Sequence, residues 1–465
     1  MASRRAIVAC ERAVGMHAAA RTRASIAQRL STKTSTCQCQ QQRWNSVSQK
    51  PNSDRVRFPG AVDSKFTTSL DFTTKDQAMP TFRVLDAEGQ FADPQNVPPE
   101  TSPEELLKMY KDMVFVSIMD LIMFDAQRQG LISFYMVSAG EEAITVGSAS
   151  SLRADDVIFA QYRETGVFQY RGFTPDDFMA QLFHTKNDAG LGRNMPVHYG
   201  SNKLHLHTIS SPLATQIPHA AGAAYALKIQ AQQNPTEPAR VVACYFGEGA
   251  ASEGDFHAAL NIAATRGSPV IFICRNNGYA ISTPTLDQYR GDGIASRGVG
   301  YGIDTIRVDG NDILAVREVT RQARERALKG NGQPVLIEAM SYRVSHHSTS
   351  DDSFAYRARV EVEEWKRRDN PITRLRKHLE LRNLWDESKE KEMRSEMRQT
   401  VLKAYRKAEK EKAPALRNMM DDVYETWTEE QREQMKKLRT ILETYPDEYD
   451  ISAYDEGLDG LNEKK

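Results

Sequence analysis

Short apolar runs alternate with helix-length amphipathic stretches between about residues 139 and 340. We expect strands at residues 157–160, 241–246, 270–274, 305–308 and 335–339. Strands separated by helical segments build parallel sheets, so the pattern predicts an α/β fold, with a parallel sheet and helices on both faces. Ligands in such folds bind at the carboxyl ends of the strands.

The pattern changes on either side of this region. Residues 46–103 are rich in Pro, Thr, Asp and Gln, which predicts an extended N-terminal arm. Ser102 and Pro103 then predict a helix start, and the helix that follows to Gln129 is apolar on nearly every side. Such a helix is buried, and we expect a subunit assembly to bury it. The α/β domain is predicted to span 104–360, and 361–465 to form a charged helical C-terminal region, either a solvated face or a partner contact.

Charge is unevenly distributed along the chain. The first 50 residues hold nine Lys or Arg, one acid and ten Ser or Thr, a composition typical of a mitochondrial transit peptide, predicted at 1–45. The alternative is a basic arm for nucleic acid. The rest carries 52 basic and 61 acidic residues, so we expect no nucleic-acid partner. No apolar run approaches the roughly 20 residues of a membrane-spanning helix, so no membrane association is expected either.

Candidate chemistry begins where two predicted strands end. Gly247-Glu248-Gly249 closes the strand at 241–246, and Arg275-Asn276-Asn277-Gly278-Tyr279 closes the next strand. In one βαβ unit these ends meet at the same sheet edge. A carboxylate, an amide oxygen and an arginine there suit magnesium and a diphosphate. The alternative is a tight turn beside an Asn-rich loop.

The spacing of these residues resembles the thiamine-diphosphate signature. Gly-Glu-Gly is followed by 27 residues and then Asn277. The family more often has aspartate at the acidic position, so Glu248 departs from it by one methylene group. The resemblance implies that Glu248, Asn277 and the Tyr279 carbonyl bind Mg²⁺.

From about 104 to 365 the chain resembles alpha subunits of the decarboxylating component of 2-oxo acid dehydrogenase complexes. Residues 161–164, 195–200 and 247–255 carry the resemblance, while 275–302 and 340–352 resemble branched-chain members. It implies oxidative decarboxylation of branched-chain 2-oxo acids (3-methyl-2-oxobutanoate dehydrogenase activity), with acyl transfer to a lipoyl carrier. The alternatives are a pyruvate-type alpha subunit and a non-catalytic regulatory subunit of the same fold.

The resemblance also implies roles for single residues. Tyr162, Arg163, Arg275 and His347 would contact the diphosphate, and His347 would also act at the reacting centre. Residues lining the thiamine pocket would be Ser211, Leu213, Gly249 and Ala250. From the residues alone, Arg163 could instead pair with Glu164, and His346 and His347 could be two solvated loop histidines.

Residues 210–216 offer hydroxyl, carbonyl and amide oxygens but no acid. Neutral oxygens suit a monovalent cation better than a divalent one. By themselves they support only a capped helix start, but the resemblance implies potassium bound through Ser210, Pro212, Thr215 and Gln216.

The resemblance finally implies partners and regulation. Only one phosphate-binding βαβ module is evident, so a beta subunit would supply the glutamate that activates the pyrimidine, in an α2β2 heterotetramer. A lipoyl-bearing acyltransferase core, a regulatory kinase and a phosphatase would complete the set, in the mitochondrial matrix. Ser348 matches the serine that the kinase phosphorylates; a second family phosphosite falls at Ala358, so control through it should be absent.

Overall fold

The computed structural model describes residues 55–56, 64–65, 68–70, 72 and 78–463. The predicted transit peptide lies outside the described residues. The chain divides into two compact units, Met1–Thr74 and Lys75–Lys465. In the first, β1 (Arg55–Val56) pairs antiparallel with β2 (Ser64–Lys65).

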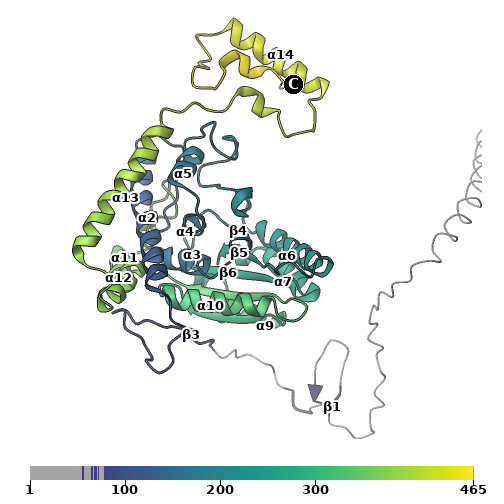
Figure 1. The fold of residues 1–465 in the computed structure, drawn as a ribbon. Helices are drawn as coiled ribbons and strands as arrows, with labels where there is room; N and C mark the ends of the chain where they lie inside the picture. The colour runs from purple at the N-terminus through teal and green to yellow at the C-terminus, as the bar shows by residue number, and fades with distance from the viewer. Residues whose placement is uncertain (1–54, 57–63, 66–67, 71, 73–77, 464–465) are drawn as a thin grey trace, which may run out of the picture. The chain divides into compact units, whose positions relative to one another are not determined.

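A six-stranded parallel sheet forms the centre of the second unit (Figure 1). Its strands, in spatial order, are β3 (Thr81–Phe82), β9 (Asp304–Asp309), β10 (Val335–Met340), β6 (Val270–Asn276), β5 (Val242–Gly247) and β4 (Val157–Phe159). The five predicted strands and the parallel α/β class are confirmed. Strand β3 was missed because it has only two residues and lies in the segment predicted to be an extended arm.

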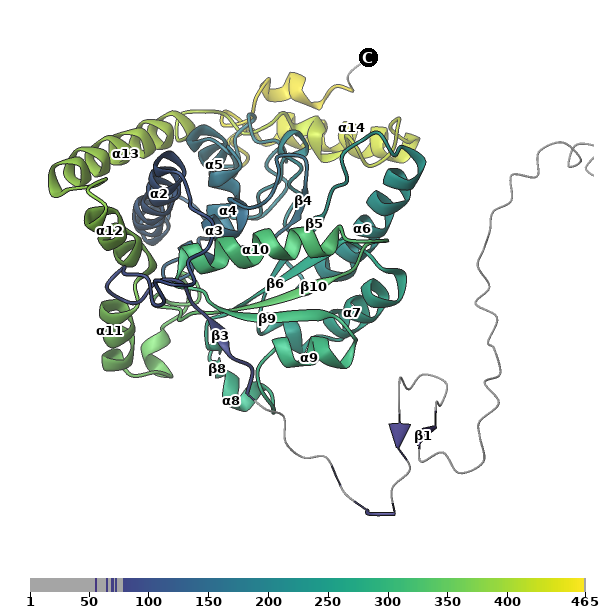
Figure 2. The same ribbon diagram turned by 60° about the horizontal axis from the view of Figure 1, so that its bottom comes forward.

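Alternate residues of the strands enter two separate cores, so helices cover both faces of the sheet (Figure 2). In β5, Ala243 and Tyr245 join the core that contains α2 (Pro103–Arg128), α3 (Glu142–Ala149) and α10 (Ile313–Ala327). Cys244 and Phe246 point the other way, into the core with α6 (Gln216–Gln233) and α7 (Gly254–Arg266). Successive side chains of a strand point to opposite faces of the sheet, so each strand is packed on both faces. This packing on both sides fixes the direction in which the end of each strand points.

Helix α2 (Pro103–Arg128) starts as predicted, with the Ser102 side chain accepting a hydrogen bond from the Glu105 N–H. The predicted reason for its burial was wrong. Helices α12 (Pro371–Leu381) and α13 (Glu387–Ala408) pack on α2 within the same chain, so no second subunit is needed to cover most of it. The C-terminal region is helical, as predicted.

The remaining helices connect these layers or extend the C-terminal region. They are α4 (Thr165–Tyr170), α5 (Pro175–Leu182), α8 (Thr285–Gln288), α9 (Ala295–Gly300), α11 (Arg359–Arg368) and α14 (Glu429–Thr444). Two short strands, β7 (Tyr279–Ala280) and β8 (Thr283–Pro284), form a hairpin after β6. Among the helices of the described residues, none is long and apolar enough to cross a membrane.

Candidate active site

The carboxyl ends of β4, β5, β6 and β10 bring most of the predicted site residues together. The parallel register places Gly247 beside Arg275, and Met340 beside Asn276. The four segments that leave these strands therefore meet at one edge of the sheet. This is the edge at which open α/β folds bind ligands.

Glu248 is a buried carboxylate that is only half satisfied. The residue as a whole is only 2% exposed to solvent. Its Oε2 accepts the Asn277 N–H at 3.4 Å, whereas Oε1 is buried and has no hydrogen-bond partner among the described residues. Burial, assisted by the nearby charge of Glu141, raises the pKa of Glu248 to about 7. A buried, unpaired carboxylate oxygen is costly, and a divalent cation removes that cost, so the site fits a bound metal.

Asn277 lies beside Glu248 with its amide oriented by neighbours. Its Nδ2 donates to Glu141 Oε1 at 2.8 Å, which turns Oδ1 away from that carboxylate. Oδ1 accepts the Tyr279 N–H at a long 3.3 Å. Orienting an amide through its nitrogen leaves the oxygen available as a ligand, in keeping with the predicted magnesium role.

Arg275 is held by two buried carboxylates. Its guanidinium donates to Glu164 and to Glu141, and both acids are fully buried. Burial alone would lower the pKa of Arg275, but the two carboxylates raise it well above its usual value. The two acids pair with Nη1 and Nε of Arg275. We therefore expect Nη2 to be the nitrogen that contacts a diphosphate.

Sequence reasoning missed Glu141, although it links Arg275, Asn277 and Arg163. It follows Gly140, which adopts a left-handed φ of 95° just before α3. An acid directly before an entirely buried helix was the available signal, since acids are rarely buried without partners.

His347 sits between two buried arginines. Arg163 Nη2 and Arg343 Nη1 each lie 3.3 Å from His347 Nδ1. Arginine can only donate, so Nδ1 is the acceptor and Nε2 carries the ring proton. Burial and these two positive charges lower the pKa of His347 to about 3, which keeps the ring neutral at physiological pH.

The loop that carries His347 is tied to the rest of the site. Arg163 Nη2 donates to the His347 carbonyl at 2.6 Å, and Asp351 Oδ2 accepts the His347 N–H at 2.8 Å. The ring of Tyr162 meets the His347 ring edge-on, with centroids 6.0 Å apart. Ser348 follows directly, and its Oγ accepts the Ser350 N–H at 3.3 Å.

Residues 210–216, which we call the cation loop, gather three of the four predicted potassium ligands. Thr215 Oγ1 lies 3.3 Å from Ser210 Oγ and 3.2 Å from the Pro212 carbonyl oxygen. Gln216 uses its Nε2 to donate to the Tyr245 carbonyl at 3.0 Å. Oxygens at this spacing, with no carboxylate among them, suit a large monovalent cation.

The four predicted thiamine-pocket residues come from two segments. Ala250 is buried and Gly249 lies so close to Ala280 that an added Cβ would come within 2.9 Å of the alanine Cβ. Ser211 and Leu213 are exposed on the cation loop, with Leu213 42% exposed. Their exposure leaves them free to contact a ligand.

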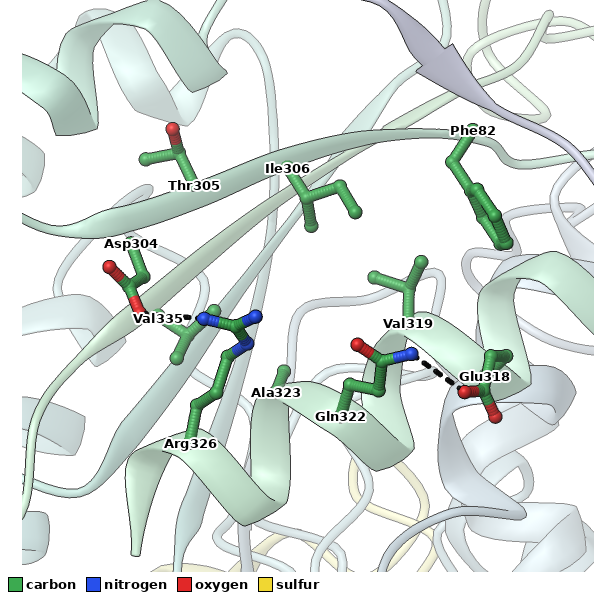
Figure 3. Close-up of a pocket in the computed structure, with 10 residues that line it drawn as sticks. All are labelled: Phe82, Asp304, Thr305, Ile306, Glu318, Val319, Gln322, Ala323, Arg326 and Val335. Carbon is green, nitrogen blue, oxygen red and sulfur yellow. Dashed lines mark hydrogen bonds and ion pairs between the residues drawn. The ribbon is translucent and has the colours of Figure 1, made fainter. Parts of the chain in front are cut away.

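A separate cavity of about 360 Å³ lies beside the first residues of β9 and β10. Figure 3 shows that α10 and Phe82 of β3 complete its lining, with Arg326 paired to Asp304. None of the predicted site residues lines it, so it is not part of the candidate active site.

Comparisons with known proteins find a family model and several relatives that match most of the chain. A family model described as dehydrogenase E1 component matches residues 110–417. The mitochondrial 2-oxoisovalerate dehydrogenase subunit alpha of Homo sapiens is 50% identical over 418 residues, covering 90% of this chain and 91% of the human one. That of Dictyostelium discoideum is 50% identical over 84% of this chain and 87% of its own. Subunit alpha 2 of Arabidopsis thaliana is 48% identical, with coverages of 86% and 83%.

Proposed function

Because the chain belongs to the dehydrogenase E1 component family, we propose that it is the alpha subunit of a branched-chain 2-oxo acid dehydrogenase. Its reaction is the thiamine-diphosphate-dependent decarboxylation of 2-oxo acids such as 3-methyl-2-oxobutanoate, with transfer of the acyl group to a lipoyl carrier. The relatives' names favour the branched-chain acid over pyruvate as substrate.

Glu248 Oε1, a buried oxygen with no hydrogen-bond partner in the described part of the chain, carries this proposal. It lies beside Asn277 at the carboxyl ends of β5 and β6, where the family's metal and diphosphate would bind. A regulatory subunit that had lost its cofactor would have no reason to keep a buried carboxylate oxygen without a partner, because such an oxygen costs stability. Glu248, Asn277 and the Tyr279 carbonyl are the proposed Mg²⁺ ligands.

The chain's own residues would bind and orient the cofactor. Thiamine diphosphate, when bound, supplies the electron sink that allows carbon dioxide to leave a 2-oxo acid. Arg163 and Arg275 Nη2 would neutralise diphosphate oxygens, and Tyr162 would contact the same group. His347 is neutral, with a proton on Nε2, so it would donate a hydrogen bond at the reacting centre without carrying a charge there.

The cation loop would hold K⁺ through Ser210, Pro212, Thr215 and Gln216, and so brace Ser211 and Leu213 against the thiamine. Partners would be a beta subunit, in an α2β2 heterotetramer that completes the site, and a lipoyl-bearing acyltransferase core. A kinase that modifies Ser348 and an opposing phosphatase would regulate the complex. The names of the relatives favour a mitochondrial location, which we take to be the matrix.

The test uses the mature chain co-purified with its beta partner, with magnesium and potassium present. Carbon dioxide release is followed from 3-methyl-2-oxobutanoate and from pyruvate, with and without thiamine diphosphate. Cofactor-dependent release that favours the branched acid is expected. Preference for pyruvate would overturn the substrate, and bound cofactor without release from either acid would point to a regulatory subunit.

A further inference from the structure

A buried histidine outside the predicted site contacts the cation loop. His198 is 6% exposed, and its Nε2 lies 2.8 Å from Ser211 Oγ. Its Nδ1 lies 3.0 Å from the Pro196 carbonyl oxygen. A carbonyl can only accept, so Nδ1 carries a ring proton, and in the neutral tautomer that this bond selects Nε2 is the acceptor for the Ser211 hydroxyl. The backbone therefore fixes both the tautomer and the direction of the bond to Ser211.

The turn that presents His198 is strained. Val197, a fully buried β-branched residue, has a left-handed φ of 65°. Non-glycine residues rarely adopt this conformation, and such outliers persist only where surrounding contacts over-determine them. The buried side-chain amide of Gln181 supplies those contacts: its Nε2 donates to the Met195 carbonyl at 2.8 Å, and its Oε1 accepts the Val197 N–H at 3.0 Å. Maintaining an unfavourable turn with a buried amide indicates that the orientation of His198 matters.

Contacts near its two ends also hold the cation loop. Before the loop, the Ile209 N–H donates to the Tyr199 carbonyl at 3.0 Å, and at its end Gln216 is bonded to Tyr245. Ala214, in a left-handed conformation with φ of 67°, is fully buried in the core that contains α6 and α7. Among the described residues, the hydrogen bond from Ser211 to His198 links the exposed residues 211–213 of the loop to the body of the domain through side chains.

We propose that His198 is a positioning residue that pre-organises the cation loop for its cation and for the cofactor. This inference rests on the proposed function, which places K⁺ and thiamine diphosphate at this loop. Ser211 stands between the proposed potassium ligands Ser210 and Pro212, so holding its hydroxyl holds their oxygens in place. Without His198 the loop must order when the cation binds, and the ordering reduces apparent affinity.

The experiment titrates potassium against thiamine diphosphate binding in the assembled α2β2 complex at constant ionic strength. Binding of the cofactor is measured by calorimetry for the wild type, His198→Leu, His198→Gln and the control His219→Gln, an exposed histidine on α6. His198→Leu should raise the half-saturating potassium concentration roughly tenfold, the equivalent of one hydrogen bond. Excess potassium should then restore cofactor affinity, which a general folding defect would not allow.

The other variants sharpen the test. Glutamine can accept the Ser211 proton through its side-chain oxygen, so His198→Gln should stay within about threefold of the wild type. Ser211→Ala removes the same bond from the other side and should reproduce the potassium shift, should His198→Leu fail to assemble. An unchanged potassium requirement in both His198→Leu and Ser211→Ala, or a loss that excess potassium does not restore, would overturn the inference. Failure of the wild-type complex to bind the cofactor would instead overturn the proposed function.

Discussion

Glu338, inside strand β10, and Glu248, directly after strand β5, are both buried carboxylates, yet their surroundings differ completely. Glu338, in β10, is fully buried, and its two oxygens accept five hydrogen bonds. The donors are the Asn276 amide, the backbone N–H groups of Ile294 and Ala295, and two nitrogens of Arg307. Glu248, after β5, has one long hydrogen bond and one oxygen with no partner among the described residues.

The difference separates a structural acid from a ligand-binding one. The Glu338 cluster is complete within this chain, because Arg307 also pairs with Asp292 at 2.8 Å. A satisfied cluster holds the loop before α9 to the sheet and has no capacity left for a ligand. Near Glu248, Arg275 donates its hydrogen bonds to Glu164 and Glu141 instead. The second oxygen of Glu248 therefore remains available to a ligand. Burial alone therefore does not identify a site, whereas burial with an unmet hydrogen-bonding need does.

Replacement of Glu248 should reduce activity far more than it reduces stability. Glu248→Gln keeps the size of the side chain but removes the charge, so magnesium binding and decarboxylation by the assembled complex should fall by about 100-fold or more. The stability of the metal-free complex should not fall, because a costly buried charge has been removed. Steady-state kinetics and thermal unfolding without metal check both expectations; near-normal activity would contradict the metal role.

The reverse pattern is expected for Glu338→Gln. This change leaves Arg307 with Asp292 as its one remaining carboxylate and should lower the free energy of unfolding by about 3–5 kcal/mol, as breaking a buried ion pair does. Activity per folded complex should change far less than in Glu248→Gln. Denaturant unfolding measures the loss, and a stability equal to the wild type would show that the two acids are not different in kind.

Lowering the pH should weaken magnesium binding at Glu248 gradually, and by less than the Glu248→Gln change does. Its pKa of about 7 in the metal-free chain lies above the usual value near 4.5, so the folded state binds a proton more tightly than the unfolded state between these values. Stability of the metal-free protein should therefore fall as pH rises from about 4.5 to 7, and magnesium should restore it. Because the proton competes with the metal, magnesium affinity should fall about tenfold for each pH unit below 7. Calorimetric titrations at pH 5.5, 6.5 and 7.5 check this slope, and Glu248→Gln should abolish it.

A negative charge at Ser348 should have a more modest effect, on the loop that carries His347. A carboxylate at Ser348 would stand close to Asp351, which already accepts the His347 N–H and the Tyr356 hydroxyl. Ser348→Glu should disorder this loop and lower activity by about tenfold through electrostatic disruption, while Ser348→Ala should retain activity. Kinetics and limited proteolysis of the loop provide the readout. Full activity in Ser348→Glu would contradict the expectation.

The sequence predicted the strands better than the network between them. Strands β5 and β6 are long apolar runs bounded by Gly and Asn, so both their positions and the meeting of their ends could be predicted. Strand β3 could not, because two residues carry no periodicity and their pairing with β9 depends on tertiary contacts. Helix α2 was correctly predicted to be buried, but what buries it depends on helices more than 240 residues later in the chain, which local pattern cannot reveal.

For the site, motif residues were predictable and their supporting partners were not. Glu248 and Asn277 follow recognisable strand ends, and the structure places them together. Glu141 and His198 belong to no spacing rule, since each is defined by a neighbour far away in sequence or by a turn conformation. Glu338, a single acid inside the apolar run of β10, was visible in the sequence as an anomaly, but only its donors show that it is structural.

The cover that α12 and α13 place over α2 bears on how the complex is made in the cell. A newly synthesised chain that covers its long apolar helix with its own C-terminal helices exposes less apolar surface before it binds a beta subunit. Chain termination before residue 371 would remove α12 and α13 and expose the apolar surface of α2, so such a fragment should be prone to aggregate. Biogenesis of this subunit would then depend on completing translation more than on meeting its partner promptly.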